Sequence, residues 1–209
     1  MITIVLHDWQ RRRNQLKLIA ALRKQTSKCK IFVWNNNPEP FPQEDVDWVI
    51  NSSLNYHQYP FPWLARQADT KYVGQFDDDL MPCGRYVLED MERELKHINN
   101  ADTILGYCGV QLREDKDYWQ SRHINEPNPL CNLPVDIVKG RVMFMNRLGI
   151  RDYPKTIHLD ISLSMSMPGN HIVSQYLYRA IKELPEGKCG YCAQPNHIAD
   201  RNAALAAWR

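Results

Sequence analysis

The chain has 209 residues, with a hydrophobic fraction of 44% and a charged fraction of 24%. This is the composition of a globular protein that is long enough to form one α/β domain. Its formal net charge of +2 argues against a general nucleic-acid-binding protein. The apolar opening, residues 2–6, is shorter than the ~7–15-residue core of a signal peptide and the ~20 residues of a membrane helix. We therefore expect a cytoplasmic protein with no integral membrane segment and no nucleic-acid partner.

The first half of the chain alternates strands and helices. The β-branched run of residues 2–6 predicts a buried parallel strand, and the apolar spacing within residues 14–24 predicts a helix. A second strand, residues 30–34, stops at the turn signal Asn35-Asn36-Asn37-Pro38. The elements expected next are a strand over 46–50, a short helix over 63–68, a strand over 71–76, a helix over 84–98 and a strand over 103–112.

The pattern is weaker in the second half. Residues 113–134 are polar and contain three prolines, which predicts a long loop. Residues 135–146 are strand-like, residues 157–167 alternate loosely, and residues 170–184 and 198–208 resemble helices. The alternation in the first half predicts a single Rossmann-type α/β domain, with a mainly parallel mixed sheet flanked by helices.

Polar residues follow four of the expected strands. They are Asp8, Asn35 to Asn37, Asn51 to Ser53, and Asp77 to Asp79. Ligands of such sheets bind beyond the carboxyl ends of the strands, so this edge is the expected site. Three consecutive carboxylates repel one another unless a cation neutralises them, and carboxylate oxygens suit Mg²⁺ or Mn²⁺. The alternative is an acidic turn that caps the following helix.

Residues 74–82, Gly-Gln-Phe-Asp-Asp-Asp-Leu-Met-Pro, resemble the DxD element of glycosyltransferases with the GT-A fold. The segment Ser53 to Pro60, followed by a strand and the aspartates, is similar to exostosin-like transferases, as is the Asn-Asn-Pro element at 36–38. Those enzymes carry an arginine where this chain has Tyr56 and His57. The resemblance spans roughly residues 2–165.

This resemblance implies a single GT-A-like domain with a nucleotide-sugar-binding half, residues 1–112, and an acceptor half with a helical tail, residues 113–209. It also implies a glycosyltransferase that uses a UDP- or GDP-type sugar with Mn²⁺ or Mg²⁺. The acceptor would be an unknown carbohydrate, lipid or protein. Two alternatives stay open: a non-catalytic nucleotide-sugar-binding protein, and a metal-dependent nucleotidyltransferase, which would want a glycine-rich phosphate loop.

On the donor side, the resemblance assigns roles to the matching residues. It implies nucleoside contacts for Asp8 and for Asn36 or Asn37, although asparagines also favour plain turns. Asn55 would lie near the diphosphate. Asp79 would ligate the metal together with Asp77, which would also touch the ribose or the donor sugar. Asp78 belongs to the same nucleotide-sugar site.

On the acceptor side, residues 135–144 are similar to a strand at which small residues let the substrate approach. Gly140 presents no side chain to obstruct a ligand, and Lys139 and Arg141 can meet phosphate or an acidic acceptor. Asp160 lies where an inverting enzyme carries its general base, which removes the proton of the acceptor hydroxyl. A helix-capping aspartate is the alternative for Asp160.

Near the end of the chain, His197 is a candidate additional metal ligand and Arg201 a candidate diphosphate contact. Cys189 and Cys192 form a Cys-x-x-Cys pair which, with His197, resembles part of a zinc knuckle. A closed zinc site normally has four protein ligands, so the glycosyltransferase interpretation is preferred.

Overall fold

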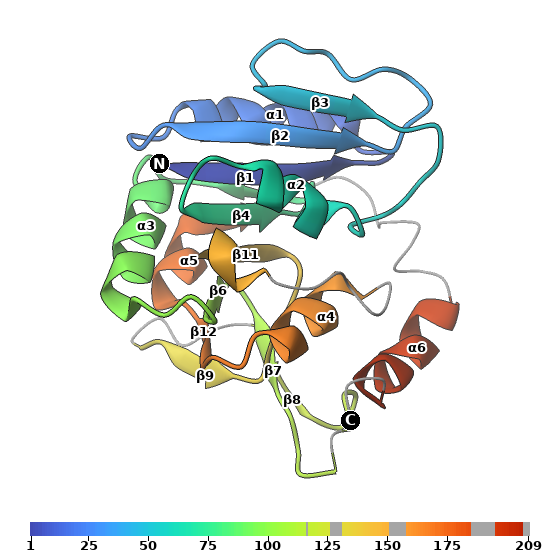
Figure 1. Ribbon diagram of the computed structural model, residues 1–209, viewed down its shortest axis with the longest axis vertical. Helices are drawn as coiled ribbons and strands as arrows, with labels where there is room; N and C mark the ends of the chain where they lie inside the picture. Colours follow the sequence, from blue (N-terminus) through green and yellow to red (C-terminus); the bar gives the residue numbers. More distant parts are fainter. Residues whose placement is uncertain (116, 126–130, 151–157, 185–194, 207–209) are drawn as a thin grey trace.

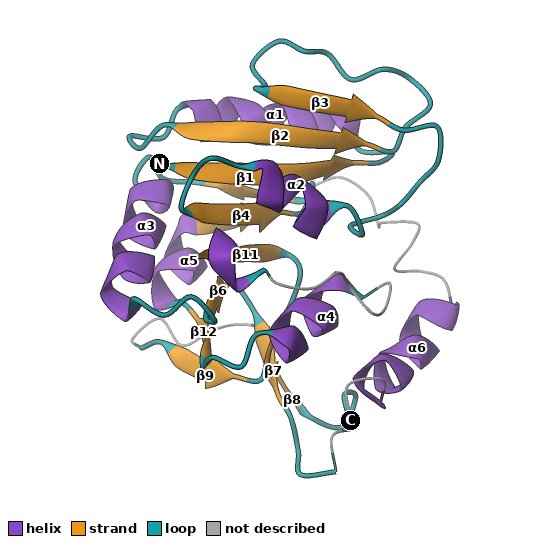
Figure 2. Cartoon of the chain, in the orientation of Figure 1, coloured by secondary structure: helices purple, strands orange, loops and turns teal. Residues whose placement is uncertain are grey.

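The computed structural model describes residues 1–115, 117–125, 131–150, 158–184 and 195–206. They form an α/β fold in which one large sheet has helices on both faces (Figure 1; Figure 2). The sheet order is β3-β2-β1-β4-β11-β6-β12-β9. Its strands are β1 (Ile2–Asp8), β2 (Cys29–Asn35), β3 (Trp48–Asn51), β4 (Tyr72–Phe76), β6 (Ile104–Gly106), β9 (Leu133–Val135), β11 (Val142–Asn146) and β12 (His171–Val173). The predicted mainly parallel mixed sheet is confirmed.

The parallel part of the sheet brings the predicted polar strand ends to one edge. β1 pairs in parallel with β2 and β4, and β2 pairs in parallel with β3. In this register Asp8 lies opposite Asn35, and Asn35 lies opposite Asn51. β11 is antiparallel to both β4 and β6, so a strand from the second half of the chain completes the sheet of the first half.

Alternating side chains of the strands feed two hydrophobic cores. Along β1, Ile4 and Leu6 point into one core and Val5 into the other, as the two-residue period of a strand requires. The first core is closed by α1 (Arg12–Arg23), α3 (Val87–Ile98) and α5 (Gln175–Ala180). The second is closed by α2 (Phe61–Gln67) and α4 (Leu159–Ser166). None of the helices among these described residues is both long enough and apolar enough to traverse a lipid bilayer.

Two small sheets lie beside the large one. One contains β10 (Ile137–Val138), β7 (Gly109–Gln111) and β8 (Arg122–Ile124), and the other pairs β13 (Ile181–Glu183) with β5 (Leu80–Pro82). A short 3-10 helix, η1 (Arg147–Gly149), follows β11. The last helix, α6 (Pro195–Ala206), packs its Ala204 and Leu205 with residues of β7, β10 and α4.

Several boundaries in the second half differ from the sequence-based expectation. The single strand expected over 103–112 is two strands, β6 and β7, that belong to different sheets. The segment expected to alternate, 157–167, contains helix α4, and the helix expected over 170–184 is a strand, a short helix and another strand. The expected loop 113–134 contains β8 and the start of β9. Strands of three residues are too short to show a periodic pattern. Helix α4 is buried on most sides, so its sequence lacks the one-sided apolar stripe of a surface helix.

Glycines allow the corner between β6 and β7. A Cβ added at Gly106 would lie 2.1 Å from Cγ1 of Val138, and one at Gly109 would lie 2.7 Å from the carbonyl oxygen of Ile137. Because β10 packs directly onto the bend, only residues without a side chain fit there. The strand-like region 135–146 is therefore also divided, with β10 on the small sheet and β11 in the large one.

Candidate functional site

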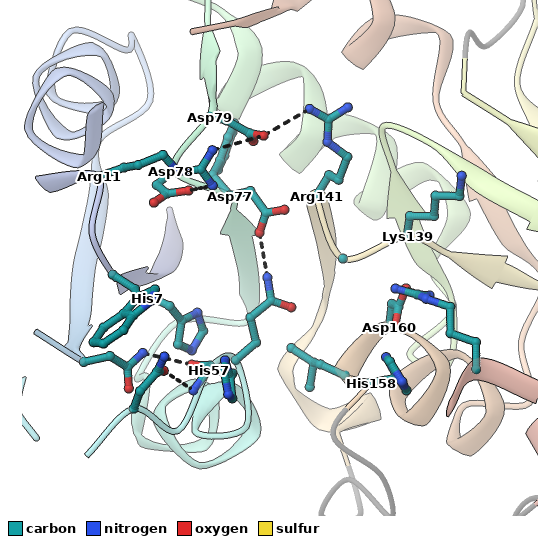
Figure 3. Close-up of a pocket in the computed structure, with 18 of the residues that line it drawn as sticks. His7, Arg11, His57, Asp77, Asp78, Asp79, Lys139, Arg141, His158 and Asp160 are labelled. Carbon is teal, nitrogen blue, oxygen red and sulfur yellow. Dashed lines mark hydrogen bonds and ion pairs between the residues drawn. The ribbon is translucent and has the colours of Figure 1, made fainter. Parts of the chain in front are cut away.

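A cavity of about 370 Å³ opens at the carboxyl ends of β1, β2 and β4 (Figure 3). The three aspartates lie on one side of it, and Lys139, His158 and Asp160 lie on the other. Among the residues predicted from the sequence, the cavity brings together Asn36, Asn55, Asp77, Asp78, Asp79, Lys139, Gly140, Asp160 and Arg201. Asp8 and Asn37 are not among its lining residues.

Two arginines contact Asp78 and Asp79. Arg11, the residue immediately before α1, forms an ion pair with Asp78, and its Nη1 lies 3.6 Å from Oδ2 of Asp79. Arg141, just before β11, places Nη2 3.5 Å from the same Asp79 oxygen and 3.1 Å from Oε1 of Glu183. Two guanidinium groups from separate elements therefore face the carboxylates at the end of β4.

Asp77 occupies a different environment. Its Oδ1 accepts a hydrogen bond of 2.6 Å from Nε2 of Gln58, and its backbone nitrogen donates to the carbonyl oxygen of Arg141 at 2.7 Å. Burial raises the pKa of Asp77 well above its usual range, and the charges of Asp79 and Asp78 raise it further. A cation bound at this carboxylate would oppose both effects.

The aspartates can contribute ligands to a divalent cation. Oδ1 of Asp79 is buried and has no hydrogen-bond partner among the described residues, and a buried carboxylate oxygen of this kind can bind a metal ion. Within the described part of the chain, no three His, Cys, Asp or Glu side chains form a metal-binding group. Mg²⁺ and Mn²⁺ at nucleotide sites commonly take one or two carboxylates and complete their shells with water and phosphate oxygens. Asp77 and Asp79 fit that arrangement.

Asp8 and Asn37 stabilise the loops beneath the cavity. Oδ2 of Asp8 pairs with Nε of Arg12 at 2.5 Å and accepts a 2.6 Å hydrogen bond from Nδ2 of Asn37. Burial raises the pKa of Asp8, whereas the Arg12 guanidinium opposes the shift. Arg12 also donates to Oδ1 of Asn35 at 3.1 Å, so it ties β1 to β2. In the structure these side chains connect strand ends to one another.

Asn36 and Asn55 line the cavity, although their side-chain oxygens are already used. Oδ1 of Asn36 accepts from the backbone nitrogen of Tyr56 at 2.8 Å and from Nε1 of Trp34 at 3.1 Å. Oδ1 of Asn55 accepts from the backbone nitrogen of His57 at 2.8 Å. His57 adopts a positive φ of 53°, which is uncommon for a residue with a side chain. These contacts fix the loop after β3 over the cavity.

His7 is a lining residue that the sequence analysis did not single out. It lies at the end of β1, and its ring is directed toward the same part of the cavity as His57 (Figure 3). Burial lowers the pKa of His7 to about 3, so the ring is neutral at physiological pH. Its Nε2 is buried and has no hydrogen-bond partner within the part of the chain that the structure describes. The available signal was its position immediately before Asp8 at a strand end.

Asp160, the expected general base, is buried in the first turn of α4 and paired with Arg201. Nη1 of Arg201 lies 2.7 Å from Oδ2 of Asp160 and donates to the hydroxyl of Tyr118 at 2.9 Å. Burial works to raise the pKa of Asp160, but the Arg201 guanidinium, the backbone N–H of Ile161 and His158 together prevail and the pKa is lowered. The carboxylate is therefore ionised at neutral pH. The structure shows Arg201 in contact with Asp160, and its expected contact with a diphosphate stays a prediction.

Lys139 and Gly140 lie between these two groups. Nζ of Lys139 donates to Oδ1 of Asn125 at 2.5 Å, and burial lowers the pKa of Lys139. A Cβ added at Gly140 would lie 3.1 Å from Oε1 of Gln58 and 3.6 Å from Cβ of Asp160. The absence of a side chain at Gly140 therefore keeps the middle of the cavity open.

His197 belongs to α6, but its side chain lies outside the described residues, as do Cys189 and Cys192. The expected metal contact of His197 and the alternative zinc pair therefore stay predictions.

The comparisons with known proteins bear on the fold. No protein-family model and no curated protein sequence matches the chain. The crystal structure of residues 1–349 of TarS from S. aureus, a glycosyltransferase, is similar, with a TM-score of 0.57 and 11% sequence identity. The similarity covers 83% of this chain and 58% of that one. At this identity the likeness establishes a GT-A-like, Rossmann-type fold and leaves the exostosin-like features as a prediction.

Proposed function

We propose that the chain is a glycosyltransferase that takes a sugar from a UDP- or GDP-type donor, with Mn²⁺ or Mg²⁺, and passes it to an acceptor. The observation that carries the proposal is the convergence, in one cavity, of the carboxylates Asp77 to Asp79 with the guanidinium groups of Arg11 and Arg141. A nucleoside diphosphate needs positive charge at its phosphates and a metal-binding carboxylate beside them. The guanidinium groups and carboxylates at the end of β4 support the proposal, because they are the groups that such a site would use.

The two arginines are proposed to bind the diphosphate. Planar guanidinium groups pair well with phosphate oxygens, and both arginines lie within reach of the Asp79 carboxylate. Ion pairs with Asp78 and Asp79 hold both guanidinium groups at the cavity. The arriving diphosphate then competes for contacts that are already arranged in the cavity.

Asp77 and Asp79 would hold the metal ion, and the unsatisfied Oδ1 of Asp79 supports this assignment. When bound, the ion supplies positive charge to the departing diphosphate. Gln58, which donates to Asp77, orients that carboxylate, and Asp78 is fixed by Arg11. The side chains thus have separate proposed roles within one triplet.

Asp160 is the proposed base on the acceptor side of the cavity. Because Arg201 lowers its pKa, the carboxylate is ionised and can accept the proton of a hydroxyl, although it is a weak base. Transfer by this route would invert the configuration at the anomeric carbon. The open space at Gly140 lets donor and acceptor approach one another.

A thermal-shift panel of UDP-, GDP- and CDP-sugars, with and without Mn²⁺, tests the donor site. A ligand that binds only the folded protein raises the melting temperature. At a concentration about a hundred times its dissociation constant, it adds about 2.7 kcal/mol to the free energy of unfolding. We expect a metal-dependent increase with one nucleotide class. No increase with any of them contradicts the proposal.

A non-catalytic nucleotide-sugar-binding protein is the second candidate. It is favoured by the Asp160–Arg201 ion pair, which occupies an oxygen that a general base needs. The two candidates differ in one respect: both require the nucleotide-induced increase in melting temperature, but only the first allows sugar to leave the nucleotide. Release of the nucleoside diphosphate over time therefore separates them.

A further inference from the structure

An exposed tryptophan lies on the acceptor side of the cavity. Trp119 lines the cavity, yet 43% of its surface is exposed to solvent. Its ring is nearly parallel to that of His123, with an interplanar angle of 17° and a centroid separation of 6.3 Å. Because Trp119 combines this exposure with a place in the cavity lining, its aromatic ring is accessible to a ligand that enters the cavity.

The turn that carries Trp119 is firmly held. The backbone nitrogens of Trp119 and Gln120 donate to Oδ1 of Asp117 at 2.8 and 2.9 Å, and a ring nitrogen of His123 lies 2.8 Å from the carbonyl oxygen of Tyr118. The backbone nitrogen of Tyr118 donates to Oδ1 of Asn202 on α6 at 2.8 Å. The exposed ring is thus presented by a turn whose backbone is fixed on several sides, which reduces the entropy lost on binding.

The same turn is linked to the proposed base. The hydroxyl of Tyr118, the neighbour of Trp119 in sequence, accepts from Arg201, and the same Arg201 nitrogen donates to Asp160. Lys139 also lines the cavity, and the negative charge of Asp160 acts to raise the pKa of Lys139 against the larger, opposite effect of burial. An aromatic face is therefore surrounded by groups that donate and accept hydrogen bonds.

This combination selects among acceptor chemistries. A lipid tail needs a continuous apolar wall, whereas the cavity that Trp119 lines is also lined by His123, Lys139 and Asp160. A sugar ring has an apolar face of C–H groups and a rim of hydroxyls. It can lie against an aromatic face while its hydroxyls meet polar side chains, as amphipathic groups generally do at such surfaces.

We propose that Trp119, backed by His123, is the stacking platform for a sugar ring of the acceptor, which makes the acceptor a carbohydrate. The proposal rests on the proposed function, since it places the acceptor beside the base Asp160. Stacked on Trp119, the ring presents one hydroxyl toward Asp160 and leaves its other hydroxyls to polar neighbours such as Lys139. Trp119 is thus assigned a role in acceptor binding and none in donor binding.

The test measures saccharide binding to protein that is saturated with the nucleotide and Mn²⁺. The probes are four tetrasaccharides, one each of glucose, galactose, mannose and N-acetylglucosamine. Their binding is measured by saturation-transfer NMR and titration calorimetry. We expect at least one to bind and Trp119→Ala to weaken it roughly 5- to 150-fold, by analogy with the loss of a stacked aromatic ring at a nucleic-acid base. Trp119→Phe should keep most of the affinity. Trp63→Phe is the matched control, because Trp63 is exposed at 36% but does not line the cavity.

The outcomes separate this inference from the proposed function. If no nucleotide raises the melting temperature of the wild-type protein, the proposed function fails. If the nucleotide binds but none of the saccharides does, or if Trp119→Ala binds them as well as the wild type does, the platform is refuted. A loss of nucleotide binding in Trp119→Ala also refutes the assignment to the acceptor, provided that the variant unfolds at the wild-type temperature.

Discussion

Replacing Arg201 by methionine tests whether the C-terminal helix is held on the site by a buried ion pair. Asp160 is 4% exposed, and its carboxylate lies 2.7 Å from the Arg201 guanidinium. Removing one partner leaves an uncompensated buried charge, which costs about 3–5 kcal/mol. For a chain of this size, 1 kcal/mol shifts the melting temperature by about 2–4 °C. We therefore expect Arg201→Met to melt about 6–20 °C below the wild type by differential scanning calorimetry.

The pH dependence of this difference checks its cause. The pKa of Asp160 is lowered in the folded protein, so the ion pair stabilises the fold above the ordinary aspartate pKa of about 3.9. That contribution is lost as the pH falls through the lower, folded pKa, so the two proteins should converge in stability under acid conditions. Arg93→Met is the control, because Arg93 is 63% exposed in its pair with Asp90 and its loss should cost under about 1 kcal/mol. Equal losses for the two variants would refute the reasoning.

For three further substitutions, the structure predicts the direction of the change in stability or in nucleotide affinity. Asp77→Asn should raise the melting temperature at neutral pH, because a carboxyl with a raised pKa destabilises the fold as the pH increases above about 4. Melting curves at pH 4 and 7.5 measure this difference. The same substitution should abolish metal-dependent nucleotide binding, because it removes a proposed metal ligand. Arg141→Gln should weaken binding of a nucleoside diphosphate about ten-fold or more in calorimetry, the loss expected for one charge-assisted contact. Gly74→Ala should cost about 1–3 kcal/mol in urea unfolding, because the added Cβ would lie 2.6 Å from Cδ1 of Phe144. An unchanged nucleotide affinity, or a Gly74→Ala protein as stable as the wild type, would count against the corresponding arguments.

The first half of the fold could be predicted because its elements are long and periodic. The strand at 2–6, the helix at 14–24 and the helix at 84–98 show a clear hydrophobic pattern, and the structure has β1, α1 and α3 there. Parallel pairing then required the polar residues after those strands to share one edge. The location of the cavity followed from this argument alone.

The second half resisted prediction because its strands are short and are defined by distant partners. His171–Val173 is a strand because it pairs with β6 and β9, and Ile181–Glu183 is a strand because it pairs with β5. No local pattern in three residues carries that information. The helix expected over 170–184 was wrong for this reason, since tertiary pairing overrode local propensity.

Within the site, residue types were more predictable than residue partners. The sequence placed Asp77, Asp79 and Asp160 near a ligand, and the structure brings them into one cavity. It gave no sign that Arg201 would pair with Asp160, because 41 residues separate them. The sequence also gave no sign that Arg11 would contact the aspartates and Arg12 would contact Asp8. Which side chains meet depends on how the loops cross the sheet edge.

The central claim is that the cavity at the end of β4 binds a nucleoside diphosphate. A crystal structure grown with Mn²⁺ and the nucleotide that raises the melting temperature tests it most directly. The account predicts the diphosphate in contact with Arg11 and Arg141, with the metal ion bound by Asp79. A nucleotide found elsewhere on the protein, or one bound here with Asp77 and Asp79 making no contact to metal or phosphate, would contradict it.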